Sequence, residues 1–145
     1  MLKIVCKDQE FLEAASAFAE WLNIEEGVVV IRSMDLSPHA IDDMAVDGMS
    51  SCTMEGIVFI LIDECCPEPI STLAHEMVHA GQYLSGRLGV RMAHWEGNEI
   101  DPFNVAEDME AYRARPWEAE AFHLQNKLAK RFTRRKLWAK IKSFF

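Results

Sequence analysis

The apolar run IVFILI, residues 57–62, constrains the fold of this chain more than any other feature. Six consecutive apolar residues, three of them isoleucine, are typical of a strand buried in a sheet. The β-branched run GVVVIRSM at residues 27–34 and the short run LKIVC at residues 2–6 also predict strands. The small polar segment GMSSCT at residues 48–53 is expected to form an edge strand. The sequence therefore predicts a small sheet of three or four strands.

Helical patterns lie between and after these strands. Apolar residues at helical spacing follow Asp8, which is placed to cap a first helix. A second helix is predicted over residues 69–85, because proline suits its first turn and Gly86 suits the position just past its end. The pattern is helical again from about residue 105, and Pro116 is expected to begin a separate helix. A small sheet packed on helices is an α+β fold.

The composition is typical of one soluble domain. The chain has 145 residues, of which 50% are apolar and 26% are charged, so it can bury a core without disulfides or a structural metal. No apolar run approaches the roughly 18 residues of a transmembrane helix, and the first residues lack the apolar stretch of a signal peptide. The four cysteines show no CxxC spacing and two are adjacent, which favours reduced thiols in a cytoplasmic protein.

The segment HEMVHAGQY, residues 75–83, carries the strongest chemical signal. On a helix, His75 and His79 lie on the same face one turn apart, so both imidazoles can bind one metal ion. Neutral imidazoles suit zinc. Glu76 is offset round the helix, where it can reach a water molecule on the metal and act as a general base. This HExxH pattern supplies two ligands and a base, and it requires a third ligand from elsewhere.

The third ligand is expected from the stretch RPWEAEAF. A catalytic zinc usually has three protein ligands. The three-histidine form, HExxHxxGxxH, is excluded because Gln82 and Ser85 occupy the positions of its glycine and third histidine. Glu118 and Glu120 point about 200° apart on a helix, so only one of them can face the metal. We expect Glu118, because Ala121 three residues later lets that helix approach the HExxH helix closely, and Glu120 is the alternative.

The pairing of HEMVH with a downstream ExEA resembles the gluzincin class of zinc metallopeptidases. The combination of HExVHxxQ, a tryptophan-glycine hairpin and PWExEA is similar to small metallopeptidases of bacteriophages and bacteria, and it covers residues 57–123. The resemblance implies a minimal zincin-like domain, one catalytic Zn²⁺ and a metalloendopeptidase that acts on protein or peptide substrates. It also implies a cytoplasmic location, in the host cell if a bacteriophage encodes the chain.

One position departs from the gluzincin pattern, which places an acid four residues after the ligand glutamate to orient a histidine. That position is Phe122 if the ligand is Glu118, or Leu124 if the ligand is Glu120. The orienting acid is therefore expected elsewhere, with these candidates: Glu107, Asp108 and Glu110.

The expected reaction also needs a donor to stabilise the transition state. Glu76 is expected to take a proton from the attacking water and to return it to the leaving amine. The candidate donors are Tyr112, Tyr83 and His94, although we favour core packing for Tyr83. His94 lies in a small hairpin predicted around the Gly97-Asn98 pair, between the segments 90–95 and 98–103. If the GMSSCT segment has a free edge, an extended peptide substrate could pair with it.

The charge divides the chain into an acidic body and a basic C-terminal segment. Residues 1–126 carry 7 Lys/Arg and 23 Asp/Glu, whereas residues 127–145 carry 8 Lys/Arg and no acid. The basic segment predicts an amphipathic helix that extends the domain. We expect its apolar stripe to cover the domain's own core and its cations to face the acidic body. Binding to a membrane surface, nucleic acid or an acidic protein remains the alternative, although no nucleic-acid partner is expected.

The leading hypothesis is a zinc peptidase with Glu76 as its general base. One alternative is a zinc-binding regulatory or interaction protein with little hydrolytic activity. Another is a module that binds an anionic surface through residues 127–145. Glu76 argues against a purely regulatory metal site, because such a site needs no base.

Overall fold

The described residues of the computed structural model, 1–39, 46–100 and 108–145, form an α+β structure around one mixed sheet. The sheet strands are β1 (Leu2–Cys6), β2 (Gly27–Met34), β3 (Gly48–Cys52) and β4 (Ile57–Asp63). They lie in the order β1-β2-β4-β3. The β1, β2 and β4 strands are parallel, whereas β3 is antiparallel to β4 and lies at the edge.

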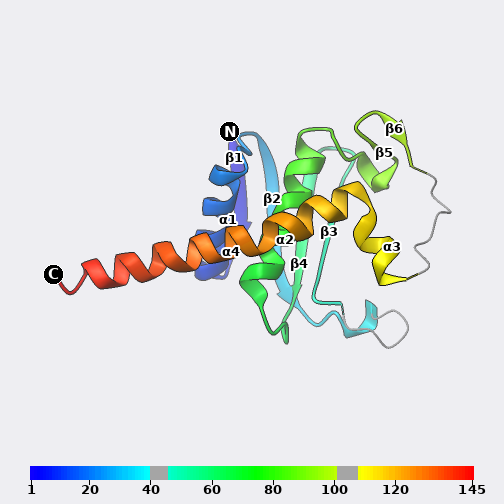
Figure 1. Ribbon diagram of the computed structural model, residues 1–145. Coiled ribbons are helices and arrows are strands. Elements are labelled where there is room, and N and C mark those ends of the chain that lie inside the picture. The colour runs from blue at the N-terminus through cyan, green and yellow to red at the C-terminus, as the bar shows by residue number, and fades with distance from the viewer. Residues whose placement is uncertain (40–45, 101–107) are drawn as a thin grey trace.

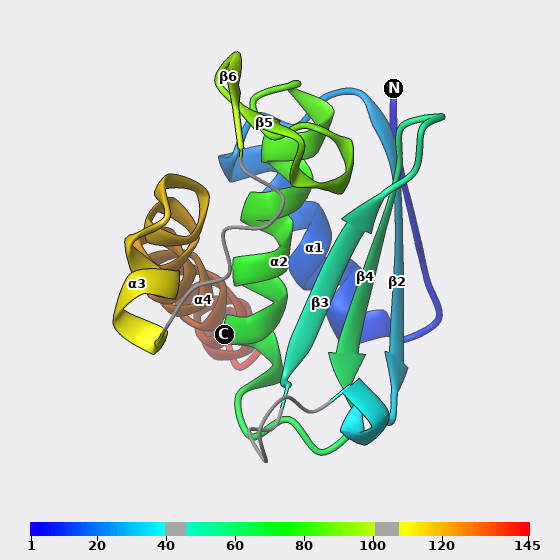
Figure 2. The same ribbon diagram turned by 90° about the vertical axis from the view of Figure 1, so that its right-hand side faces the viewer.

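The helices form two further layers on one side of this sheet (Figures 1 and 2). They are α1 (Gln9–Trp21), α2 (Pro69–Leu84), α3 (Met109–Ala114) and α4 (Pro116–Lys142), with short 3₁₀ turns η1 (Ser37–His39) and η2 (Val90–Met92). In Figure 2, α1 and α2 cover the sheet, and α4 lies against α2 on the side away from the sheet. The α2 helix is therefore held between the sheet and α4.

Local sequence explains where the first two helices begin and end. The Asp8 side chain accepts a hydrogen bond from the Phe11 backbone N–H at 2.9 Å, which caps α1. Pro69 occupies the first turn of α2. Beyond the last turn of α2, Gly86 has φ +78°, a conformation that favours glycine.

The core lies between the sheet and α1 and α2. Alternate residues of β4 point to this side, and Val58, Ile60 and Ile62 are fully buried there. The opposite face of the sheet carries no helix among the described residues, so Phe59 is 37% exposed. IVFILI is thus buried on one face only, because the described helices all pack on the other side of the sheet from Phe59.

The predicted α+β class and the edge strand at GMSSCT are confirmed. A hairpin around Gly97 is present, and its strands among the described residues have two residues each, β5 (His94–Trp95) and β6 (Asn98–Glu99). The start predicted for the next helix, near residue 105, lies outside the described residues. No helix among the described residues is long and apolar enough to cross a membrane.

Candidate metal centre

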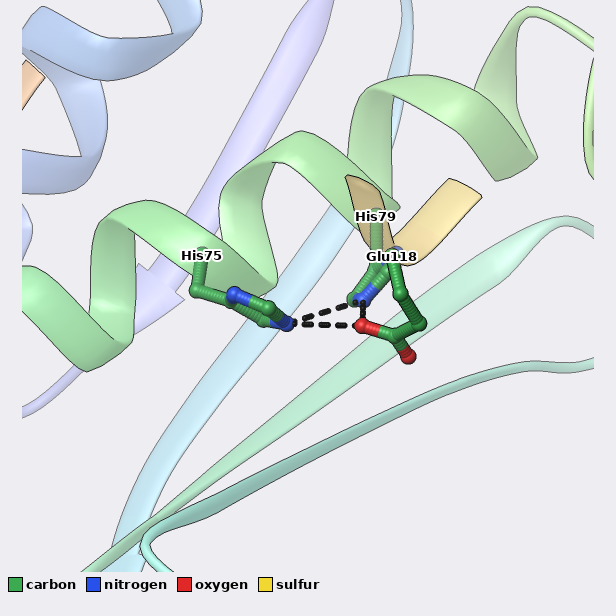
Figure 3. A group of neighbouring side chains, drawn as sticks. All are labelled: His75, His79 and Glu118. Carbon is green, nitrogen blue, oxygen red and sulfur yellow. Dashed lines mark hydrogen bonds and ion pairs between the residues drawn. The ribbon is translucent and has the colours of Figure 1, made fainter. Parts of the chain in front are cut away.

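Three side chains from α2 and α4 converge on one point (Figure 3). The Nε2 atoms of His75 and His79 are 3.2 Å apart. Glu118 Oε1 lies 2.9 Å from the first of these atoms and 3.0 Å from the second. The side chains of His79 and Glu118 are almost fully buried. Residues four apart on α2 and one residue in the first turn of α4 thus form a compact group that could hold a metal ion.

The spacing of these atoms fits a tetrahedral ion. Ligands bound at about 2.0–2.1 Å in tetrahedral geometry lie roughly 3.3 Å apart. The three observed separations, 2.9, 3.0 and 3.2 Å, are within a few tenths of an ångström of that value. Two imidazoles and a carboxylate are also a donor set typical of zinc. The residues present therefore fit a zinc ion in both chemistry and geometry.

Two glutamines set the orientation of the histidine rings. The Nδ1 atom of His75 lies 2.7 Å from Gln125 Oε1, and the Nδ1 atom of His79 lies 2.7 Å from Gln82 Oε1. An amide oxygen can only accept a hydrogen bond, so each Nδ1 must donate its proton. Neutral rings in this tautomer leave the Nε2 lone pairs free, and both point toward Glu118.

Gln82 also ties α2 to α4. Its Nε2 donates to the Trp117 backbone carbonyl at 3.0 Å and to Glu120 Oε1 at 3.2 Å. Gln82 is 1% exposed, so these hydrogen bonds are shielded from water. The same side chain thus orients His79 and anchors the start of the helix that carries Glu118.

Glu120 does not join the metal group. Its carboxylate receives hydrogen bonds from the Arg87 guanidinium at 2.7 and 2.9 Å. Burial alone raises the pKa of Glu120, but the hydrogen bonds from Arg87 and Gln82 hold that pKa below its usual value. Arg87 also binds Glu96 of the β5-β6 loop at 2.9 Å. The alternative ligand therefore has a structural role, joining α4 to α2 and to the hairpin.

In the metal-free centre, the Glu118 carboxylate is negatively charged and one histidine is positively charged. Burial raises the pKa of Glu118, but the close contacts with His75 and His79, and the positive charge on His79, hold that pKa well below its usual value. Burial lowers the pKa of His79, but Glu118 outweighs this effect and raises the pKa to about 8. Without a metal, a proton on His79 therefore balances the buried Glu118 carboxylate at neutral pH.

Glu76 lies between α2 and the edge strand β3. It is 6% exposed, and burial raises the pKa of its carboxyl group, while both ligand histidines and a hydrogen bond with Ser50 oppose that rise. A Cβ at Gly48 would approach Glu76 Oε1 to 3.3 Å and the Thr72 side chain to 2.6 Å. Glycine at this position of β3 therefore leaves room for the glutamate beside the metal ligands.

The three candidate donors to the transition state have different surroundings. Tyr112, on α3, hydrogen bonds with Glu118, and burial raises the pKa of its phenol far above the usual value. Tyr83 packs against the hydrophobic core, and burial raises its pKa to about 12. His94 lies on β5, where it would meet a Cβ placed on Gly89. Among these three, Tyr112 is the residue in contact with a metal ligand.

The expectation of an orienting acid near the centre is not met by the described residues. Asp108 caps α3 by accepting from the Ala111 N–H, Glu110 is exposed, and Glu107 lies outside the described residues. The two glutamines take the place of the acid. Phe122 packs edge-on against the His75 ring, with the ring centroids 4.6 Å apart. The orienting role of Gln82 could have been predicted from its spacing, because Gln82 lies three residues after His79 on the same helix face.

No family model, curated protein or solved structure matches this chain. The fold and the site define its class by themselves. It is an α+β protein with a His/His/Glu group, held between two helices, that could bind a metal ion.

Proposed function

We propose that this protein is a zinc-dependent peptidase. His75, His79 and Glu118 hold the zinc ion, and Glu76 is the general base. The observation that carries the proposal is the convergence of both Nε2 atoms and Glu118 Oε1 within about 3 Å of one another, with the Glu76 carboxyl buried beside them. A glutamate in this position has no role in holding the metal, but it suits proton transfer.

The chain's own residues divide the work of hydrolysis. A zinc ion held here supplies Lewis-acid activation of a water molecule and of the substrate carbonyl. Glu76 takes the proton of the attacking water and delivers it to the leaving amine. Its raised pKa suits this exchange, because a carboxyl group with a pKa nearer to neutrality both accepts and releases a proton readily. Tyr112, in contact with Glu118, is the candidate donor to the developing oxyanion.

The edge strand β3 suits a peptide substrate. Among the described residues, β4 is the one strand that pairs with β3, and η2 packs against part of β3, so the rest of its outer edge is the candidate place for another strand. Ser50 on this strand interacts with Glu76. An extended peptide that pairs with β3 would therefore pass next to the general base. This arrangement favours protein or peptide substrates over small amides.

One observation favours the alternative, a zinc-binding protein with little hydrolytic activity. Glu76 and His79 are each only 6% exposed, and Glu118 is 4% exposed. A base with so little exposure meets water and substrate only through a narrow approach. The two functions share the metal site and differ in whether Glu76 does chemistry.

The deciding experiment compares the wild-type chain with Glu76→Gln. Zinc content is measured by mass spectrometry after loading and desalting, and hydrolysis is measured on an unfolded protein substrate. We expect both proteins to hold one zinc ion and only the wild type to cleave. The control is Glu55→Gln, an exposed acid far along the sequence in the β3-β4 turn, which should retain both properties.

Three results contradict the proposal in different ways. If the wild-type chain holds no zinc under zinc-replete conditions, His75, His79 and Glu118 do not form a zinc site. A zinc-loaded wild type without cleavage supports the regulatory alternative. Cleavage that persists undiminished in Glu76→Gln shows that Glu76 is not the base.

A further inference from the structure

The last two turns of α4 and the residues after them form an exposed apolar surface. These residues and their exposed fractions are Leu137 (56%), Trp138 (62%), Ile141 (37%), Phe144 (77%) and Phe145 (104%). In Figure 1, this end of α4, coloured orange to red, extends past α1 and away from the sheet. The expectation that the apolar stripe of residues 127–145 covers the domain's own core is therefore wrong for its second half.

The apolar side of α4 changes direction along the helix. Leu128 and Phe132 face the core and are 7% and 5% exposed. Ile141 lies nine residues after Phe132, which at about 100° per residue turns its side chain roughly 180° away. Leu137 shares the face of Ile141, because it lies four residues before it. Phe144 follows just past the end of α4, and its backbone N–H donates to the Ile141 carbonyl at 3.1 Å. The terminal apolar residues thus point away from the body of the protein.

The outward face of α4 is one continuous stripe, cationic at first and apolar afterwards. Its residues recur every three or four positions: Lys127, Lys130, Arg134, Leu137, Ile141 and Phe144. We call these six residues the outer stripe. Lys140 and Lys142 flank its apolar half on either side. A flat surface laid along this face would meet cations and apolar side chains together.

Cations on the other side of the helix are already engaged with the body. Arg131 lies over the Trp21 ring at 4.2 Å. Arg135 and Lys136 form ion pairs with glutamates of α1 at 3.5–3.9 Å. Among the described residues, no ion pair involves Lys130 or Arg134 of the outer stripe. The body thus uses one set of cations, whereas Lys130 and Arg134 line an open groove with Glu68 and form no ion pair among the described residues.

We propose that the outer stripe docks α4 onto a lipid bilayer that carries anionic headgroups. Leu137, Ile141 and Phe144 enter the boundary between headgroups and acyl chains, while Lys140 and Lys142 extend from their flanks to the headgroups. Lys130 and Arg134 bind anionic headgroups along the same face. Nucleic acid would satisfy the cations but would leave the aliphatic side chains in water. This proposal does not depend on the peptidase function.

The test measures binding of the full chain to large unilamellar vesicles by co-sedimentation. Vesicles of pure phosphatidylcholine are compared with vesicles containing equal parts of phosphatidylcholine and phosphatidylglycerol. At about 1 kcal/mol for each cation near the surface, Lys130 and Arg134 alone predict a preference of at least roughly 30-fold for the anionic vesicles. Binding should also weaken as salt concentration rises.

Two outer-stripe variants separate the cationic and apolar contributions. The double variant Lys130→Gln/Arg134→Gln should bind anionic vesicles roughly 30-fold more weakly. The triple variant Leu137→Gln/Ile141→Gln/Phe144→Gln should lose about a hundredfold or more. The matched control, Lys3→Gln/Lys7→Gln, removes two exposed cations from the body and should bind within about threefold of wild type. Circular dichroism checks that each variant is folded.

Any of four results overturns the proposal. The wild type shows no preference for anionic vesicles, or the triple variant binds them as tightly as the wild type does. Alternatively, a single-stranded or double-stranded oligonucleotide binds the outer stripe more tightly than the vesicles do. Finally, sedimentation velocity shows a wild-type dimer that the triple variant abolishes, which assigns the stripe to a second copy of this chain.

Discussion

The first and second halves of α4 differ in which side of the helix is apolar and in what that side contacts. In the first half, Trp117, Ala121 and Leu128 are buried and hold Glu118 against the histidines of α2. In the second half, the apolar residues point the opposite way and are exposed, from Leu137 onward. One helix therefore fixes a candidate metal ligand through close packing at one end and has an exposed apolar surface at the other.

The largest effect is expected at the metal ligand in the first half. Glu118→Ala should weaken zinc affinity by about a hundredfold or more, because one of three protein ligands is lost. The matched variant Glu120→Ala breaks the ion pair with Arg87 and should keep zinc affinity within about tenfold of wild type. Competition titration with a chromophoric chelator measures both. If Glu120→Ala were the more damaging change, the ligand assignment would be reversed.

The second prediction compares equivalent truncations in the two halves. Leu128→Ala should lower the free energy of unfolding by about 2–5 kcal/mol, since it opens a cavity in the core. Leu137→Ala should change that energy by less than about 0.5 kcal/mol, because the side chain is already exposed. Urea denaturation of the metal-free proteins measures the difference. If both variants lost the same free energy of unfolding, the second half of α4 would be packed against other residues in solution, contrary to the structure.

The third prediction concerns the glutamines that orient the histidines. Gln125→Leu should weaken zinc affinity by roughly 10- to 100-fold, because the His75 ring loses the partner of its Nδ1 proton. Gln82→Leu should cost a similar factor and should also destabilise the fold by about 1–3 kcal/mol, since the buried hydrogen bonds from Gln82 to the Trp117 carbonyl and to Glu120 are lost. Zinc titration and urea denaturation of both variants separate the two effects. Unchanged affinity in both variants would refute the orienting role.

The smallest effect is the pH dependence of zinc binding. His79, with a pKa of about 8 in the metal-free protein, must lose its proton to bind zinc. Apparent affinity should therefore rise up to about tenfold for each pH unit as pH approaches 8, and more slowly above it. Calorimetry in buffers of different ionisation enthalpy should show release of about one proton at pH 7. No proton release at pH 7 would mean that His79 is already neutral there.

The helix that carries the two histidines and the strands of the sheet could be predicted from local sequence. The four-residue spacing of His75 and His79 places both on one face of any helix that contains them. Pro69 and Gly86 bracket that helix in the structure as they do in the sequence. The strands follow from β-branched runs, because such residues favour extended backbone.

The orienting partners and the outer stripe were harder to predict. A glutamine is a common surface residue, and nothing in its local sequence shows that its oxygen will meet a histidine 50 positions away, as in the pair of Gln125 and His75. The apolar residues near Leu137 fit a core stripe when the helix pattern is considered alone. Their exposure follows from the length of α4, which extends past the body that its first half covers.

The sequence by itself determined the local geometry of the centre, because helix periodicity places both histidines on one face and turns Glu118 away from Glu120. Only the tertiary structure decided which glutamate faces those histidines. That choice depends on the rotation of α4 about its own axis, which is set by the packing of Ala121, Leu128 and Phe132 and by the hydrogen bonds from Gln82. These are contacts between segments far apart in the chain, and no local pattern encodes them.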